Sequence, residues 1–336
     1  MSGLCRSRLA PSPTGALHLG NARTFLLTWL DARAHGRELV MRMEDLDGPR
    51  TKPGAAEQAL EDLRWLGLDW DGETLVQSTR AAAHGQALER LRAAGRVYPC
   101  VCTRKEIDQA RSAPHEGEWP SYPGVCADRF ADGAAAEAAS GRAPAWRFRV
   151  DAAREVAFQD RFRGPERHVP GRDSGDFVVA KQTGEAAYQL AVVVDDAFQQ
   201  VDLVIRGDDL VPSTPLQLLL YEALGLPAPT FCHLPLVRGP DGRRLAKRHG
   251  DTRIAHYREA GVPPERVVGL LAHWSGLGPR APISAAELRA EGFGWERVPR
   301  QDVTFEPADD AWLLAGRAPG GRAEPPRPGG SEGARP

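Results

Sequence analysis

Residues 11–21 read PSPTGALHLGN, a turn-rich stretch that joins two segments of different periodicity. An apolar, strand-like run precedes it at residues 4–10, and helix-like spacing follows over residues 22–34. A helix that starts here would aim His18 and its first free backbone N–H groups at an anion. The two glycines of the stretch suit a loop whose backbone approaches a nucleotide closely. We therefore expect ATP contacts from Pro11, Gly15, His18, Gly20 and Asn21.

A second phosphate-handling signature, RLAKR, occupies residues 244–248. A basic loop of this kind is typical of a solvated turn when it stands alone. An ATP that is attacked at its α-phosphate, however, needs positive charge from a second direction. Lys247 suits that task, because a lysine is a point charge on a flexible stem. We predict that His18 and Lys247 are catalytic and that the chain is an adenylate-forming ligase.

The composition narrows the class of protein. The chain has 336 residues, of which 42% are hydrophobic and 26% are charged, as in a globular protein with one large core and one or two smaller modules. No apolar run approaches the roughly 18 residues that span a bilayer, so we expect a cytoplasmic protein without membrane contact. The net charge of −2 shows no basic excess, so any RNA contact must come from local patches.

The order of the predicted elements indicates an α/β fold that begins with a β-α-β unit. Its second strand, residues 38–44, ends at Glu44. Ligands of open parallel sheets bind at the carboxyl ends of the strands, so Glu44 is expected at the ligand-binding edge. The β-branched residues of 188–196 and 201–206 predict two further buried parallel strands. Residues 254–314 have mostly helical spacing.

Five cysteines are an odd number for a disulfide framework, and three of them lie between positions 100 and 126. A metal site is therefore the more plausible interpretation, since zinc prefers four tetrahedral ligands that are mostly thiolates and imidazoles. Cys100, Cys102 and Cys126 supply three such ligands. Spacing alone favours His115 as the fourth. The alternative is a set of reduced, buried cysteines in a small β-rich insertion.

These motifs resemble those of the class I aminoacyl-tRNA synthetases. HLGN at residues 18–21 stands where that class has its His-Ile-Gly-His motif, and residues 244–248 stand where it has Lys-Met-Ser-Lys-Ser. The resemblance extends over about residues 4–275 and is closest to the glutamyl-specific branch. Three more stretches resemble that branch, namely residues 8–15, 43–47 and 206–210.

The resemblance implies a Rossmann-like class I catalytic domain with a zinc-binding insertion and a C-terminal helical domain. The expected boundaries are 1–95 and 181–250 for the two halves of the catalytic domain, 96–180 for an inserted acceptor-binding-like module, 251–315 for a helical stem-contact-like domain and 316–336 for a disordered tail. Glutamyl-tRNA synthetases continue into an anticodon-binding domain, which we do not expect here. The shortened outline resembles a paralogous group that attaches glutamate to the queuosine base at the wobble position of tRNA(Asp). The implied partners are ATP with Mg²⁺, L-glutamate and tRNA(Asp) carrying queuosine.

Glutamate has two carboxylates and one ammonium, so its pocket needs two donor-rich ends and one acidic group. Arg8 and Arg206 stand at strand ends that face the same sheet edge, where each guanidinium can hold a carboxylate with two N–H groups. Tyr188 can donate its hydroxyl, and Glu44 can bind the ammonium. The expected glutamate-binding residues are Arg8, Leu9, Ala10, Pro11, Ser12, Glu44, Tyr188 and Arg206.

The resemblance also points to a different fourth ligand for the metal. It matches Tyr122, the first residue of YPGVC, although a phenolic oxygen is an unusual zinc ligand. One structural zinc ion is thus implied, with Cys100, Cys102, Tyr122 and Cys126 as its ligands.

Two departures from the family pattern lie in the late loop. Arg244 replaces the first Lys and Ala246 replaces the Ser, which removes a hydroxyl that could bind phosphate, so slower activation is expected. Two other functions stay open on the sequence. One is a shortened glutamyl-tRNA synthetase that charges a tRNA 3′ end, and the other is a synthetase-like RNA-binding protein without catalysis.

Overall fold

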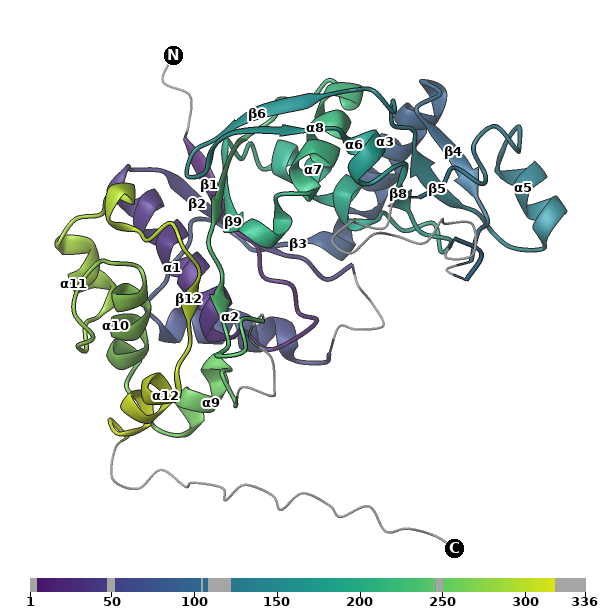
Figure 1. Cartoon of the computed structure of the whole chain (residues 1–336). Coiled ribbons are helices and arrows are strands. Elements are labelled where there is room, and N and C mark those ends of the chain that lie inside the picture. The colour runs from purple at the N-terminus through teal and green to yellow at the C-terminus, as the bar shows by residue number, and fades with distance from the viewer. Residues whose placement is uncertain are drawn as a thin grey trace, which may run out of the picture.

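A seven-stranded sheet forms the centre of the molecule in the computed structural model, which describes residues 5–46, 52–103, 105–107, 122–243, 245 and 250–317 (Figure 1). The strand order is β3-β2-β1-β9-β10-β6-β7. The pairs from β3 to β6 are parallel, and only β7 runs antiparallel to its neighbour within this sheet. The strands are β1 (Arg6–Leu9), β2 (Glu38–Met43), β3 (Leu75–Val76), β6 (Val156–Asp160), β7 (Gly164–His168), β9 (Leu203–Gly207) and β10 (Thr230–Leu234).

Both faces of the central strands of this sheet are buried. In β2, Leu39 and Met41 belong to one hydrophobic core, and Val40 between them belongs to the other. Alternate strand residues point to opposite faces, so β2, β9 and β10 contribute to both cores. Helices α1 (Leu19–Ala34), α2 (Ala55–Trp65), α10 (Pro264–Trp274) and α11 (Ala285–Ala290) contribute to the first core, and α3 (Ala81–Ala93), α7 (Tyr188–Phe198) and α8 (Ser213–Leu224) contribute to the second. The predicted α/β class is confirmed.

The strand predicted over residues 188–196 is wrong, because these residues form helix α7. Their β-branched content suits a buried strand, yet a short apolar run with burial on most sides fits a buried helix equally well. Four consecutive residues of the helix, from Leu190 to Val193, are almost fully buried. Packing of α7 against α3 and α8 overrides the local strand preference.

A separate three-stranded antiparallel sheet carries the cysteines. It consists of β4 (Val97–Cys100), β5 (Ala145–Phe148) and β8 (Phe177–Ala180), with α5 (Gly133–Ser140) beside it. This module lies at the end of the molecule opposite α10 and α11 (Figure 1). Within the expected insertion of residues 96–180, β6 and β7 pair in the central sheet and not in the module.

The C-terminal part of the described chain is mainly helical. α9 (Ile254–Glu259) and α12 (Pro307–Leu314) join α10 and α11 there, and β12 (Val303–Thr304) pairs in parallel with β11 (Val237–Arg238). These helices share a core with α1, whereas residues 318–336 lie outside the described part of the chain. Among the described helices, none has the length and apolar character needed to cross a membrane.

Candidate active site

Two adjoining cavities open at the carboxyl edge of the central sheet. The larger measures about 650 Å³ and the smaller about 160 Å³. His18, Asn21, Glu44 and Tyr188 line both. Among the predicted ATP contacts, Pro11 and Gly15 line the larger cavity and Gly20 lines the smaller. Among the predicted glutamate contacts, Ser12 lines the larger cavity, Arg8 and Arg206 line the smaller, and Ala10 lines both.

His18 is both the N-cap of α1 and a wall of the two cavities. Its Nδ1 accepts hydrogen bonds from the backbone N–H groups of Gly20 at 3.1 Å and Asn21 at 3.4 Å. An imidazole nitrogen that accepts carries no proton, so the proton of the neutral ring lies on Nε2. The structure therefore unites the capping role and the cleft position in one residue. The sequence suggested that the first backbone N–H groups of this helix would face an anion. In the structure, two of them donate to the imidazole of His18 instead.

The two glycines near His18 differ in what they require. A Cβ at Gly20 would lie 3.1 Å from Cε1 and 3.2 Å from Nδ1 of His18, so glycine lets the imidazole sit against the start of the helix. A Cβ at Gly15 would meet nothing within 4 Å. Gly15 is thus not required by the packing of the free protein, and its small size matters only to a ligand in the larger cavity.

Arg8 and Arg206 are buried together, and each is only 5% exposed. They meet because β1 and β9 are parallel neighbours that end at the same edge. Arg8 Nη1 donates to the carbonyl of Ile205 at 3.2 Å, and its Nε lies 3.4 Å from Asp196 Oδ1. Burial lowers the pKa of Arg206, and the charge of Arg8 acts in the same direction. Two buried cations facing one small cavity favour an anionic ligand.

The two arginines differ in the donors that they leave for a ligand. Arg206 gives its Nε–H to His233, one Nη1–H to Gln217 and its Nη2–H groups to Leu210 O and Thr214 Oγ1. Among the described residues Nη2 of Arg8 has no hydrogen-bond partner. Arg8 can therefore hold a carboxylate with two N–H groups, whereas Arg206 has one N–H left, on Nη1.

Glu44 is held by a buried arginine that the sequence analysis did not single out. Fully buried Arg42 donates through Nη2 to Glu44 Oε1 at 2.9 Å and through Nη1 to Asp196 Oδ1 at 2.6 Å. Although burial alone would lower it, these two carboxylates raise the pKa of Arg42. Ser12 Oγ donates to the backbone oxygen of Glu44 at 3.1 Å. A chain of charges thus links Arg8, through Asp196 and Arg42, to Glu44.

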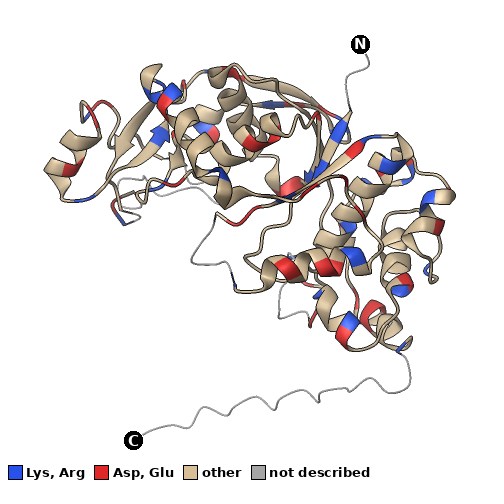
Figure 2. Ribbon diagram, turned by 180° about the vertical axis from the view of Figure 1, so that it is seen from behind, with Lys and Arg blue, Asp and Glu red and all other residues tan. Residues whose placement is uncertain are grey.

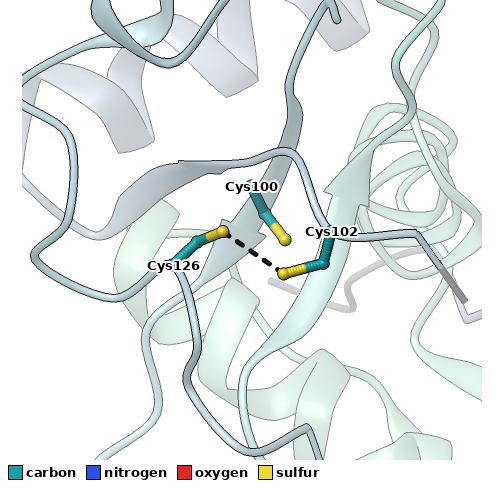
Figure 3. A group of neighbouring side chains, drawn as sticks. All are labelled: Cys100, Cys102 and Cys126. Carbon is teal, nitrogen blue, oxygen red and sulfur yellow. Dashed lines mark hydrogen bonds between the residues drawn. The ribbon is translucent and has the colours of Figure 1, made fainter. Parts of the chain in front are cut away.

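The thiol groups of Cys100, Cys102 and Cys126 converge in the separate module, with their Sγ atoms within 4.8 Å of one another (Figure 3). Tyr122 Oη lies 3.4 Å from Sγ of both Cys100 and Cys102. Burial raises the pKa of Cys102 to about 12, so a cluster of thiolates needs a cation to neutralise it. Three thiols and one phenol around a common point fit a tetrahedral metal ion. His115 lies outside the described residues.

Comparison with known proteins identifies the family. Residues 5–285 match the family described as tRNA synthetases class I (E and Q), catalytic domain. The chain belongs to this family. The predicted enzyme class, a class I synthetase and hence a ligase, is confirmed.

The chain is similar to two groups of synthetases. It is 49% identical to the glutamyl-Q tRNA(Asp) synthetase of Symbiobacterium thermophilum, over 93% of this chain and 99% of the relative. The protein of that name from Rhodopirellula baltica is 48% identical, over 91% and 97% of the two chains. The glutamate–tRNA ligase of Synechococcus sp. WH7803 is 40% identical, but this chain covers 67% of it. A crystal structure of glutamate-tRNA synthetase from Elizabethkingia anophelis superimposes with a TM-score of 0.77 at 28% identity, covering 92% of this chain and 69% of that one.

Among the described site residues that the sequence predicted, Leu9 does not line the cavities. The side chain of Leu9 is fully buried in the core that includes α1. Lys247 lies outside the described residues, as do Arg244 and Ala246. The sequence analysis also missed Arg42 and Lys181. Arg42 had a signal, since it is a charged residue inside an apolar strand, and Lys181 lines the larger cavity without belonging to any motif.

Proposed function

We propose that this synthetase joins L-glutamate to ATP, forming glutamyl adenylate and pyrophosphate, and then transfers the glutamyl group to the queuosine base of tRNA(Asp). The main observation in favour of glutamate as the amino-acid substrate is the pair of buried arginines beside Glu44. A doubly acidic amino acid matches two buried cations and one carboxylate. The acceptor is supported by the relatives named glutamyl-Q tRNA(Asp) synthetase, which align along nearly their whole length.

In the first step, a carboxylate oxygen of glutamate attacks the α-phosphorus of ATP, and the bond to pyrophosphate breaks. Negative charge grows on the phosphoryl oxygens, so preorganised donors accelerate the step. The Nε2–H of His18 is one such donor, because Nδ1 is bound to the start of α1. Mg²⁺ enters with the ATP phosphates and neutralises part of their charge.

Lys247 is proposed as the second cation, and the residues on either side of it support this. Before it, Leu245 lines the smaller cavity together with His18. After it, Thr252 O accepts from the N–H of Leu19 at 3.0 Å, and Ile254 N donates to Leu17 O at 2.8 Å. Leu245 and Thr252, which stand before and after Lys247 in the sequence, thus both lie near His18.

In the second step, a hydroxyl oxygen of the acceptor attacks the activated carbonyl carbon. The bond between that carbon and the phosphate oxygen breaks, and AMP leaves. Lys181 lies on the wall of the larger cavity. Basic and acidic positions are interspersed along the described ribbon (Figure 2). Recognition of tRNA therefore depends on local contacts.

We also propose that the metal is one structural zinc ion, held by the three cysteines with Tyr122 as the fourth ligand. The donor set suits zinc, since thiolates are among its preferred ligands. Tyr122 is the available oxygen donor at the described cluster, being 3.4 Å from two of the three Sγ atoms. The metal would fix the end of β4 to the following loop and takes no part in the adenylate chemistry.

The deciding experiment supplies labelled glutamate and ATP with tRNA(Asp) that carries queuosine, with the same tRNA lacking it, and with tRNA(Glu). We expect labelling of the first tRNA alone, together with glutamate-dependent exchange of pyrophosphate into ATP. Labelling of an unmodified tRNA(Glu) transcript would favour a shortened glutamyl-tRNA synthetase. The similarity to glutamate–tRNA ligases is the reason for testing this alternative. Absence of exchange with glutamate would exclude both enzymes.

A further inference from the structure

A buried histidine and aspartate stand behind Arg206 without lining either cavity. His233 lies in β10 and Asp160 ends β6, and both are fully buried. His233 Nδ1 is 2.6 Å from Asp160 Oδ2. Asp160 Oδ1 also accepts from the backbone N–H groups of Phe162 at 2.9 Å and Arg163 at 2.8 Å. Although burial alone would raise it, these hydrogen bonds hold the pKa of Asp160 below its ordinary value.

These contacts determine where the proton of His233 resides. An ionised carboxylate only accepts, so Nδ1 of His233 must carry the proton that it shares with Asp160. On the other side of the ring, Arg206 Nε lies 3.0 Å from His233 Nε2. A guanidinium only donates, so Nε2 must be an unprotonated acceptor. The imidazole is therefore neutral, and burial lowers the pKa of His233 in agreement with this.

The neutral histidine fixes the plane of the Arg206 guanidinium. Besides His233 Nε2, two further acceptors bind the guanidinium. Gln217 Oε1 lies 3.0 Å from Nη1 of Arg206, and Thr214 Oγ1 lies 2.8 Å from its Nη2. With these bonds in place, one Nη1–H of Arg206 is left for a ligand, and Arg206 lines the smaller cavity together with Arg8. An arginine held on three sides loses little conformational entropy when it binds a carboxylate.

We propose that His233 is a positioning residue for glutamate binding, which holds Arg206 in place by staying neutral with its proton directed at Asp160. This rests on the proposed function, in which Arg206 contacts a glutamate carboxylate. The groups that face His233 are Asp160 from β6, Arg206 from β9 and Thr214 from α8, while Phe231 stacks on the ring and Arg163 adds positive charge nearby. At acid pH a proton on Nε2 would remove the acceptor for the Nε–H of Arg206 and place two donors against each other. The guanidinium would then lose its hydrogen bond to His233.

Two substitutions test the roles of the two ring nitrogens of His233 separately. His233→Asn keeps an amide N–H near the place of Nδ1, so it still donates to Asp160, but it has no acceptor for Arg206. His233→Gln places an amide oxygen near Nε2, so Arg206 keeps its acceptor. In glutamate-dependent pyrophosphate exchange we expect the KM for glutamate to rise about tenfold to a hundredfold in His233→Asn and about threefold or less in His233→Gln. The KM for ATP should change in neither.

The pH profile provides a second test that needs no variant. For the native enzyme, the KM for glutamate should stay constant from about pH 8 down to about 6.5 and rise only below that, because burial lowers the pKa of His233, while the KM for ATP does not follow it. The His233→Gln enzyme should lack this rise, because a carboxamide does not titrate in this range. A flat native profile, or a His233→Asn enzyme with native KM for glutamate, would overturn the positioning role. Complete absence of exchange in the native enzyme would instead contradict the proposed function.

Discussion

The cleft and the cysteine cluster are two sites built in different ways. Arg8 and Ile205, which touch in the cleft, are 197 positions apart, and only the order of the parallel strands brings them together. The sulfur ligands lie between positions 100 and 126, on β4 and the loop segments that follow it. The cleft therefore depends on the whole sheet, whereas the cysteine cluster depends on one small module and on the proposed zinc ion. Damage to one should leave the other largely intact.

The largest effect is expected from Arg42, because it joins the charges of the cleft inside the sheet. Arg42→Met would leave Asp196 and Glu44 without their buried partner, which should lower the free energy of unfolding by about 3–5 kcal/mol. Denaturant unfolding measures this. As a control, exposed Arg92, paired with Glu89, should cost about 1 kcal/mol or less when it is replaced by Met. A mild effect of Arg42→Met would mean that the charge chain does not hold the cleft together.

His18 offers the next test, since its two roles can be separated. His18→Asn keeps a side-chain acceptor at the N-cap and removes the Nε2 donor, so kcat for pyrophosphate exchange should fall about 100-fold to 1000-fold while stability stays near native. His18→Ala should show the same kinetic loss and also lower the free energy of unfolding by about 1 kcal/mol. Native kcat in His18→Asn would show that His18 is only a cap.

Removal of the metal tests the independence of the module. We expect about one zinc ion per chain by elemental analysis, and much less in Cys102→Ala. Exchange of pyrophosphate should stay within about threefold of native, because no cysteine of the cluster lines the cleft, whereas protease should cut the module faster. Cys5→Ser, which removes an exposed thiol elsewhere, should keep the metal. Loss of adenylate formation along with zinc would contradict the separation of the two sites.

The glycines of the cleft should give smaller kinetic effects than His18 does. Gly20→Ala presses a methyl group against the His18 ring, so kcat should fall by about tenfold. Gly15→Ala adds a methyl group with free space around it, and should change only the KM for ATP. Exchange kinetics at varied ATP distinguish the two outcomes. Equal behaviour of the two variants would show that the contact with His18 is unimportant.

The sequence was sufficient for the β-α-β start and for placing Arg8 and Arg206 at one edge, because strand ends and helix starts are encoded locally. It was not sufficient for residues 188–196, whose apolar run fits a strand or a buried helix until its neighbours are known. Nor could it show that most donors of Arg206 are already bound. Apart from the backbone oxygen of Leu210, their acceptors are side chains of α8 and β10, which the residues around position 206 do not reveal.

The metal ligands illustrate the same limit at shorter range. Spacing favoured His115, and the family resemblance favoured Tyr122, whose hydroxyl lies at the thiols in the structure. Which residue folds back to a cluster depends on the path of the loop, and spacing alone does not determine that path. The choice between the two residues stays a prediction, because His115 lies outside the described residues.

The place of β1 between β2 and β9 has a consequence for biosynthesis. A ribosome releases the chain from its N-terminus, so β1 and β2 emerge long before Leu203–Gly207 exists to cover the free edge of β1. Until then the growing polypeptide exposes an unpaired strand that carries Arg8, a template for wrong pairing. Nascent chains arrested before β9 should need chaperone protection, and the amino-acid pocket can form only late in translation.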